Sequence, residues 1–215
     1  MLDEQHARHP DKLIVHTEGT IDHIASEPSR NAACPNKPCG CDPTYACWQD
    51  DAWYWKKEAT DWSWDWAPDR QIDYPNYAPA FRYARDLVVG LDHWLSGWVD
   101  WNIVLDKRGG PNHVGDYCLA PVMVDDETDL VCYTPLLYIL KQVSRHGRPG
   151  GVVIDTTLAV PDGAHSVAIR NPDGSVAVHV LNESEADVDY ALQIGSRSAA
   201  LTSPAASLQT VVITP

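Results

Sequence analysis

The stretch from Gly97 to Asp116 constrains the fold more than any other part of the sequence. It opens with apolar and aromatic residues of the kind that form strands, and it then breaks into a Gly-Gly-Pro turn. Two polar residues, Asn112 and His113, follow the turn directly. We therefore expect a short buried strand whose end presents polar side chains.

Two tryptophans of this stretch, Trp98 and Trp101, stand three residues apart. Successive side chains of a strand point to opposite faces, so residues three apart cannot share a face. We expect one indole ring to pack in the core and the other to reach a cleft. Such a cleft would suit a sugar as its ligand. The commoner use of any single tryptophan is core packing.

Composition limits the classes of partner. The chain has 215 residues, of which 44% are hydrophobic, which is enough for one large or two small domains. A formal net charge of -14 argues against nucleic acid and anionic membranes as partners, and a neutral substrate fits better. No apolar run approaches the roughly 20 residues of a membrane span, and the amino terminus shows no signal peptide.

A carboxylate follows the first predicted strand, which covers residues 11–17. This strand ends at Thr17-Glu18-Gly19. Barrel enzymes present catalytic acids and nucleophiles at the carboxyl ends of strands, and this makes Glu18 a candidate. On pattern alone, a glutamate in this position is more often a solvated loop residue.

Helical periodicity is clearest over residues 76–95, where apolar residues recur at spacings of three and four. The polar residues Arg82, Arg85, Asp86 and Asp92 are predicted to face outward. After this helix we expect a strand over residues 98–104, a hairpin over residues 117–133 and a closing helix over residues 135–145. Cys118 and Cys132 lie near the open ends of the hairpin, where a disulfide can form.

The chain changes character beyond Gly150. Short strands rich in Val, Ile and Ala alternate with turns such as Asn171-Pro172-Asp173-Gly174, which is typical of an antiparallel sandwich. Nothing in this module clusters into a site on sequence grounds. Glu183 and Glu185 are most simply solvated loop residues.

Residues 24–77 form a long segment without periodicity. Cys34, Cys39, Cys41 and Cys47 lack the paired knuckles of structural zinc sites, so disulfides or reduced thiols are favoured over a metal. We predict at least one disulfide, which favours a secreted or extracytoplasmic protein. Six tryptophans over residues 48–66 form either a lid at a substrate entrance or an aromatic core for the loop itself.

Several of these motifs occur together in the order of one known family. The segments 16–19, 97–116, 120–125, 147–150 and 171–182 resemble glycoside hydrolase family 30, the family of the glucosylceramidases. The resemblance covers most of the chain outside residues 24–75. It implies an α/β plus all-β fold: residues 1–146 as the C-terminal part of a (β/α)8 TIM barrel, with its last two strand-helix units and a long Cys/Trp-rich insertion, and residues 147–215 as an antiparallel β-sandwich.

The resemblance also implies roles for individual residues. Glu18 matches the family's catalytic nucleophile, Trp101 a wall facing the sugar, and Asn112 a hydrogen-bond donor to the substrate. The implied activity is that of a retaining glycosidase acting on a β-glucoside or a glucosylceramide-like substrate, without metal or cofactor.

The sequence departs from the family pattern in one respect, because it lacks the general acid/base glutamate of such enzymes. That glutamate lies well upstream of the nucleophile, whereas 17 residues precede Glu18 here. The Asn182-Glu183 pair lies in the predicted sandwich and is no substitute. We therefore expect the chain to be the C-terminal portion of a glucosylceramidase-like enzyme, inactive alone, with the missing N-terminal barrel portion as a partner. The alternatives are a non-catalytic carbohydrate-binding protein and a cysteine-loop metal module.

Overall fold

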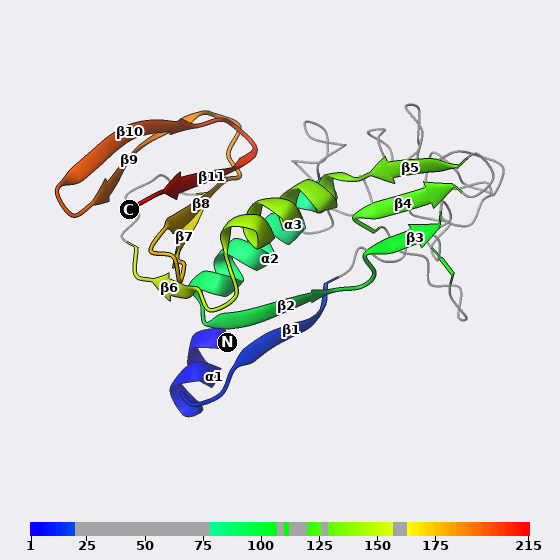
Figure 1. Cartoon of the computed structure of the whole chain (residues 1–215), viewed down its shortest axis with the longest axis horizontal. Coiled ribbons are helices and arrows are strands. Elements are labelled where there is room, and N and C mark those ends of the chain that lie inside the picture. The colour runs from blue at the N-terminus through cyan, green and yellow to red at the C-terminus, as the bar shows by residue number, and fades with distance from the viewer. Residues whose placement is uncertain (20–77, 107–109, 112–119, 126–128, 157–162) are drawn as a thin grey trace. The chain divides into compact units, whose positions relative to one another are not determined.

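The computed structural model describes residues 1–19, 78–106, 110–111, 120–125, 129–156 and 163–215 (Figure 1). The predicted cysteine and tryptophan loop and the predicted disulfides therefore lie outside the described residues and side chains. Contacts group the chain into two compact units. One unit contains Met1–His16, Tyr83–Trp98 and Ile139–Pro215, and the other contains Thr17–Arg82 and Val99–Tyr138.

Two strands form the first sheet, β1 (Ile14–Gly19) and β2 (Leu95–Asp100). Near their starts, the side chain of Val15 lies 3.5 Å from the position of a Cβ on Gly97. At their ends, the Trp101 amide donates to the Gly19 carbonyl at 2.8 Å. Both contacts advance together along the chain, so the strands are parallel, as in Figure 1. Neighbouring parallel strands are the arrangement expected of a barrel segment.

Helix α2 spans Ala78–Asp92 and precedes β2. Its buried side chains recur at helical spacing and include Ala80, Phe81, Tyr83, Ala84, Leu87 and Val88. The helix ends three residues before the predicted end, because Leu95 already belongs to β2. The prediction that Arg85 faces outward is wrong, because its guanidinium is paired with the buried Glu183.

The predicted strand over residues 98–104 is divided between two sheets. Residues 98–100 complete β2, whereas β3 (Val104–Asp106) pairs in parallel with β4 (Val122–Asp125). β4 pairs antiparallel with β5 (Leu130–Tyr133), which confirms the predicted hairpin. Helix α3 (Pro135–His146) follows, with a proline in its first turn. The fully buried Thr134 donates its hydroxyl to the Ala120 carbonyl at 2.9 Å and fixes the start of α3.

Six strands of the described ranges belong to the β-sandwich at the carboxyl end. They are β6 (Val152–Ile154), β7 (Ala164–Arg170), β8 (Val176–Asn182), β9 (Val188–Ile194), β10 (Arg197–Ser203) and β11 (Ser207–Ile213). One sheet has the order β11-β8-β7-β6, and the other pairs β10 with β9, all antiparallel. Ala168, Val178 and Val180 lie at the centre of the core.

Two features differ from the sequence prediction or were absent from it. Helix α1 (Leu2–Arg8) was not predicted, because a seven-residue segment without buried side chains gives no apolar periodicity. The prediction of Glu183 as a solvated loop residue is wrong, because its side chain is buried. Among the helices of the described ranges, none is long and apolar enough to cross a bilayer.

Candidate active site

Glu18 lies next to the last residue of β1, and its side chain is exposed. The strand continues to Gly19, which is buried. Thr17, Glu18 and Gly19 thus form the end of the strand itself, not a loop that follows it. This position leaves the carboxylate accessible to a ligand while β1 fixes its backbone.

Trp101 directly follows β2 and is 52% exposed. The hydrogen bond from its amide to Gly19 joins the carboxyl ends of β1 and β2. The structure therefore places Glu18 and Trp101 on neighbouring strand ends, although they are 83 residues apart in sequence. The peptide bond between Trp101 and Asn102 is cis.

The other tryptophan of the pair, Trp98, packs inward. Its ring stacks on His16 with ring centroids 5.5 Å apart and meets the edge of Tyr83 at 4.8 Å. This arrangement confirms that Trp98 and Trp101 differ in environment, one packed against aromatic neighbours and one largely exposed. Trp98 belongs to β2, whereas Trp101 lies just past the end of that strand, so strand alternation does not fix the side on which the Trp101 ring lies.

Asp100 is a half-buried carboxylate that is not among the predicted site residues. Alternation along β2 places it on the same face as Trp98. The stack between Trp98 and His16 identifies the matching face of β1, to which Glu18 also belongs by alternation. Asp100 and Glu18 therefore share one face near the ends of the strands. The Trp-x-Asp pattern would have indicated Asp100 once Trp98 was known to point inward.

The third predicted residue, Asn112, lies outside the described residues, as does His113. Asp106 and Gly110, which precede them in the chain, are among the described residues and contact each other. The Asp106 amide donates to the Gly110 carbonyl at 2.7 Å, and the Gly110 amide donates to the Asp106 carboxylate at 3.0 Å. A cis peptide bond then joins Gly110 to Pro111.

Glu183 is the carboxylate that could be mistaken for the missing general acid. The Arg85 guanidinium binds it through both carboxylate oxygens, at 2.9 Å from Nε and 2.7 Å from Nη2. Burial raises the pKa of Glu183, but hydrogen bonds and charge from His165 and Arg85 outweigh it and lower this pKa below its ordinary value. A carboxyl group with a lowered pKa is a poor proton donor, so Glu183 is unsuited to general acid catalysis.

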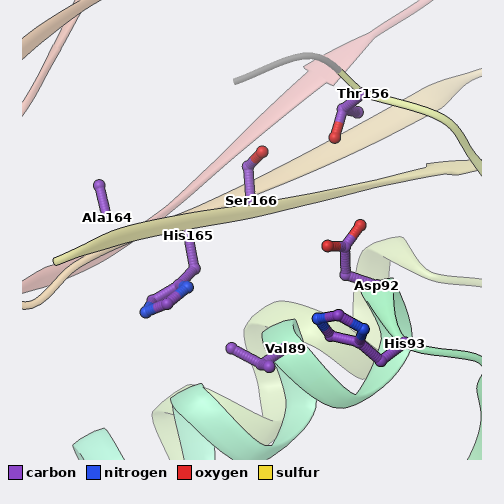
Figure 2. Close-up of a pocket in the computed structure, with 7 residues that line it drawn as sticks. All are labelled: Val89, Asp92, His93, Thr156, Ala164, His165 and Ser166. Atoms are coloured by element: carbon purple, nitrogen blue, oxygen red, sulfur yellow. The ribbon is translucent and has the colours of Figure 1, made fainter. Parts of the chain in front are cut away.

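A separate pocket of about 140 Å³ lies between the end of α2 and the start of β7 (Figure 2). Its lining contains none of the predicted site residues. It consists of Val89, Asp92, His93, Thr156, Ala164, His165 and Ser166. Within the described ranges, no group of three or more His, Cys, Asp or Glu side chains is arranged to hold a metal ion.

Curated relatives of the chain are glucosylceramidases. Putative glucosylceramidase 1 of Caenorhabditis elegans is 34% identical over 116 residues, which are 54% of this chain and 22% of that protein. Lysosomal acid glucosylceramidase of Mus musculus is 29% identical over 120 residues, which are 56% of this chain and 23% of that protein. The matched region thus spans less than a quarter of either relative.

Solved structures share the fold over the whole chain. SrfJ from Salmonella typhimurium matches with a TM-score of 0.69 and 21% identity, covering 100% of this chain and 38% of that one. The endo-β1,6-glucanase BT3312 matches with a TM-score of 0.69 and 20% identity, with the same coverage. At these identities the similarity shows the fold alone.

Two family models match consecutive parts of the sequence. The TIM-barrel domain of glycosyl hydrolase family 30 matches residues 48–146, and the β-sandwich domain of the same family matches residues 150–211. The two matches together include most of the chain and agree in order with the strands and helices described above. The chain therefore belongs to glycosyl hydrolase family 30.

Proposed function

We propose that this chain supplies the nucleophile side of the active site of a retaining β-glucosidase that resembles glucosylceramidase. The observation that carries the proposal is the position of Glu18, exposed at the carboxyl end of β1 and next to the strand end that carries Trp101. Barrel enzymes assemble their catalytic groups at this edge. The glucosylceramidase names of the relatives support a β-glucoside such as glucosylceramide as the substrate.

Glu18 has the role of nucleophile in this proposal. Its carboxylate attacks the anomeric carbon as the glycosidic bond breaks, and a glycosyl-enzyme ester forms. A second carboxyl group, roughly 5 Å away, protonates the leaving oxygen and later activates the water that hydrolyses the ester. Trp101 forms a wall against the sugar ring, and Asn112 donates a hydrogen bond to it.

The second carboxyl group is proposed to come from a barrel segment that this chain does not contain. Glu183 cannot replace it, because Arg85 holds that carboxylate in its charged form inside the protein. We therefore expect residues 1–146 to complete a barrel only together with that segment, while residues 147–215 form the sandwich. The chain alone should bind and turn over β-glucosides poorly.

The test compares this chain with a version joined to an N-terminal barrel segment of a family 30 enzyme. Both proteins are assayed on an aryl β-glucoside and on glucosylceramide. In the joined protein, Glu18→Gln should reduce turnover by more than roughly 10²- to 10⁴-fold, the range for loss of general acid/base catalysis. Glu185→Gln, at an exposed sandwich position, is the matched control and should leave turnover unchanged.

A mechanism-based 2-fluoro glycoside identifies the nucleophile directly. Mass spectrometry should find the glycosyl adduct on Glu18 of the joined protein. An adduct on another residue would refute the assignment, and robust turnover by the 215-residue chain would refute the need for a second segment. Sugar binding by the joined protein without turnover or labelling would favour the non-catalytic carbohydrate-binding alternative.

A further inference from the structure

Helix α1 is held in place without any buried side chain of its own. Isolated helices shorter than about 12 to 15 residues are marginal in water, and α1 has seven residues. The pair between Arg8 and Glu4 lies within the helix and does not attach it to the rest of the protein. The position of α1 must therefore depend on its contacts with a neighbouring element.

Two such contacts join α1 to the turn between α2 and β2. The His6 ring stacks on Trp94 with centroids 3.7 Å apart and planes inclined by 8°. The Asp3 carboxylate lies 2.8 Å from the Nδ1 atom of His93. Trp94 has a positive φ of 72°, a backbone conformation that is uncommon for a bulky residue, and the residue is 53% exposed.

Each contact contains one imidazole ring, and imidazole is the side chain that changes charge between pH 5 and 8. A protonated His6 over the Trp94 ring would form a cation–π contact. A protonated His93 would add the attraction of an ion pair to its hydrogen bond with the Asp3 carboxylate. The hydrogen bond from His93 also lowers the pKa of the Asp3 carboxyl, which shows that this pairing favours the charged carboxylate.

We propose that Asp3, His6, His93 and Trp94 form a clasp that holds α1 against the α2–β2 turn and that tightens on acidification. The inference does not depend on the proposed enzymatic function. The clasp lies ahead of both β1 and β2, the strands whose far ends carry Glu18 and Trp101. It should be tighter where imidazoles are charged and carboxyls remain ionised than at neutral pH.

The other charges around His93 determine the sign of the effect. Figure 2 shows Asp92 beside His93 at the end of α2, and His165 of β7 lines the same pocket. The Asp92 carboxylate adds negative charge beside His93. His165 has a carboxylate neighbour of its own, because Glu183 lies 3.5 Å from its Nε2 atom. The positively charged amino group of Met1 also attracts the Asp3 carboxylate, with a smaller effect on the Asp3 pKa than His93 has.

Amide hydrogen exchange by NMR measures the clasp in the whole chain. The Gln5 amide donates to the Met1 carbonyl and the His9 amide to the Gln5 and His6 carbonyls, so both report on the opening of α1. After correction for intrinsic exchange, their protection factors should rise about three- to tenfold between pH 7.5 and pH 5.5. The Asp3→Asn/His6→Gln double variant should lose this rise. His9→Gln, at an exposed position directly after α1, is the matched control and should keep it.

A second measurement keeps the proposal testable if the double variant releases α1 at every pH. Both contacts lie near the surface, so 1 M NaCl should suppress most of the rise in the unmodified chain. Protection that is unchanged or falls on acidification would overturn the clasp. An equal rise in the double variant would do the same.

Discussion

The Glu183 carboxylate is buried and nevertheless charged, because Arg85 and His165 surround it with donors. Arg85 lies 98 positions earlier in the chain, on α2. A local pattern cannot reveal such a pair, since each partner alone is an ordinary charged residue. This is why the sequence predicted both side chains to face solvent.

Arg85→Met should lower the free energy of unfolding by about 2 to 4 kcal/mol, because it leaves a buried carboxylate without its main partner. The value lies below that of a fully buried pair because the Arg85 side chain is 34% exposed. Adding Glu183→Gln should recover part of the loss. Urea unfolding measures both, with the exposed Arg145→Met as control, and an additive double variant would contradict the coupling.

His179 on β8 is fully buried and neutral. Thr210 donates its hydroxyl to Gln142 at 2.9 Å, so the same hydroxyl accepts the Nδ1 hydrogen of His179 at 2.9 Å. Burial, with the charge of His146, lowers the pKa of His179 to about 4. The Nε2 atom has no hydrogen-bond partner among the described residues, so protonation there would bury an unpaired donor.

The free energy of unfolding should therefore fall as the pH drops from about 6.5 to 4. In this range the histidine of the unfolded chain binds a proton, whereas His179 of the folded chain stays neutral. The contribution is fully present above pH 6.5, and its loss reaches about 3 kcal/mol near pH 4. His179→Gln should flatten this part of the curve. Urea unfolding at several pH values tests it, and an unchanged slope in the variant would contradict the assignment. The control is the exposed His9→Gln.

At the scale of elements, periodicity predicted α2, the hairpin of β4 and β5, α3 and the sandwich strands. It failed at the ends and at irregular points. The apolar pattern after α2 continues through Trp101, but the chain changes sheet between β2 and β3. Hydrophobic alternation indicates strand type but not the partner strand, so the sequence could not locate that change.

One asparagine connects two elements of the sandwich unit. Asn171 accepts a hydrogen bond from the Arg148 amide at 2.9 Å and donates to the His146 carbonyl at 2.8 Å. It thereby attaches the end of α3 to the turn between β7 and β8. In that turn, Gly174 takes a φ of 84°, which favours glycine.

Asn171→Ala should destabilise the protein by about 2 to 4 kcal/mol, because it leaves two backbone groups near the end of α3 without partners. Asn171→Asp keeps the acceptor and should cost less. Urea unfolding gives the order of the two variants, and exchange of the Gly147 amide should quicken in the alanine variant. Equal effects of both changes would contradict this account, and the exposed Gln193→Ala on β9 is the control.

At the scale of the molecule, large apolar side chains remain exposed in and next to strands β1 to β5. They include Leu13, Val15, Val99, Trp101, Ile103, Val104, Val131 and Tyr133. Extended exposed apolar surface marks an interaction site or an aggregation hazard. In a complete barrel, apolar side chains on such strands are normally covered by helices or by neighbouring strands.

The isolated chain should consequently be marginally stable and should bind a dye specific for apolar surface. Joining it to an N-terminal barrel segment should reduce dye fluorescence and raise the unfolding midpoint. Ile103→Thr, at a position that is 68% exposed, should reduce dye binding without lowering stability. Cooperative unfolding of a monodisperse chain without dye binding would contradict the prediction.

The compact unit that contains the sandwich is assembled from three separate stretches of chain. The first two stretches supply α1 and most of α2, and the third begins inside α3. A recombination event that moved residues 147–215 alone would leave Glu183 without Arg85 and Thr210 without Gln142. We therefore expect the sandwich to be inherited together with the helices that precede it, so that family members exchange sandwiches rarely.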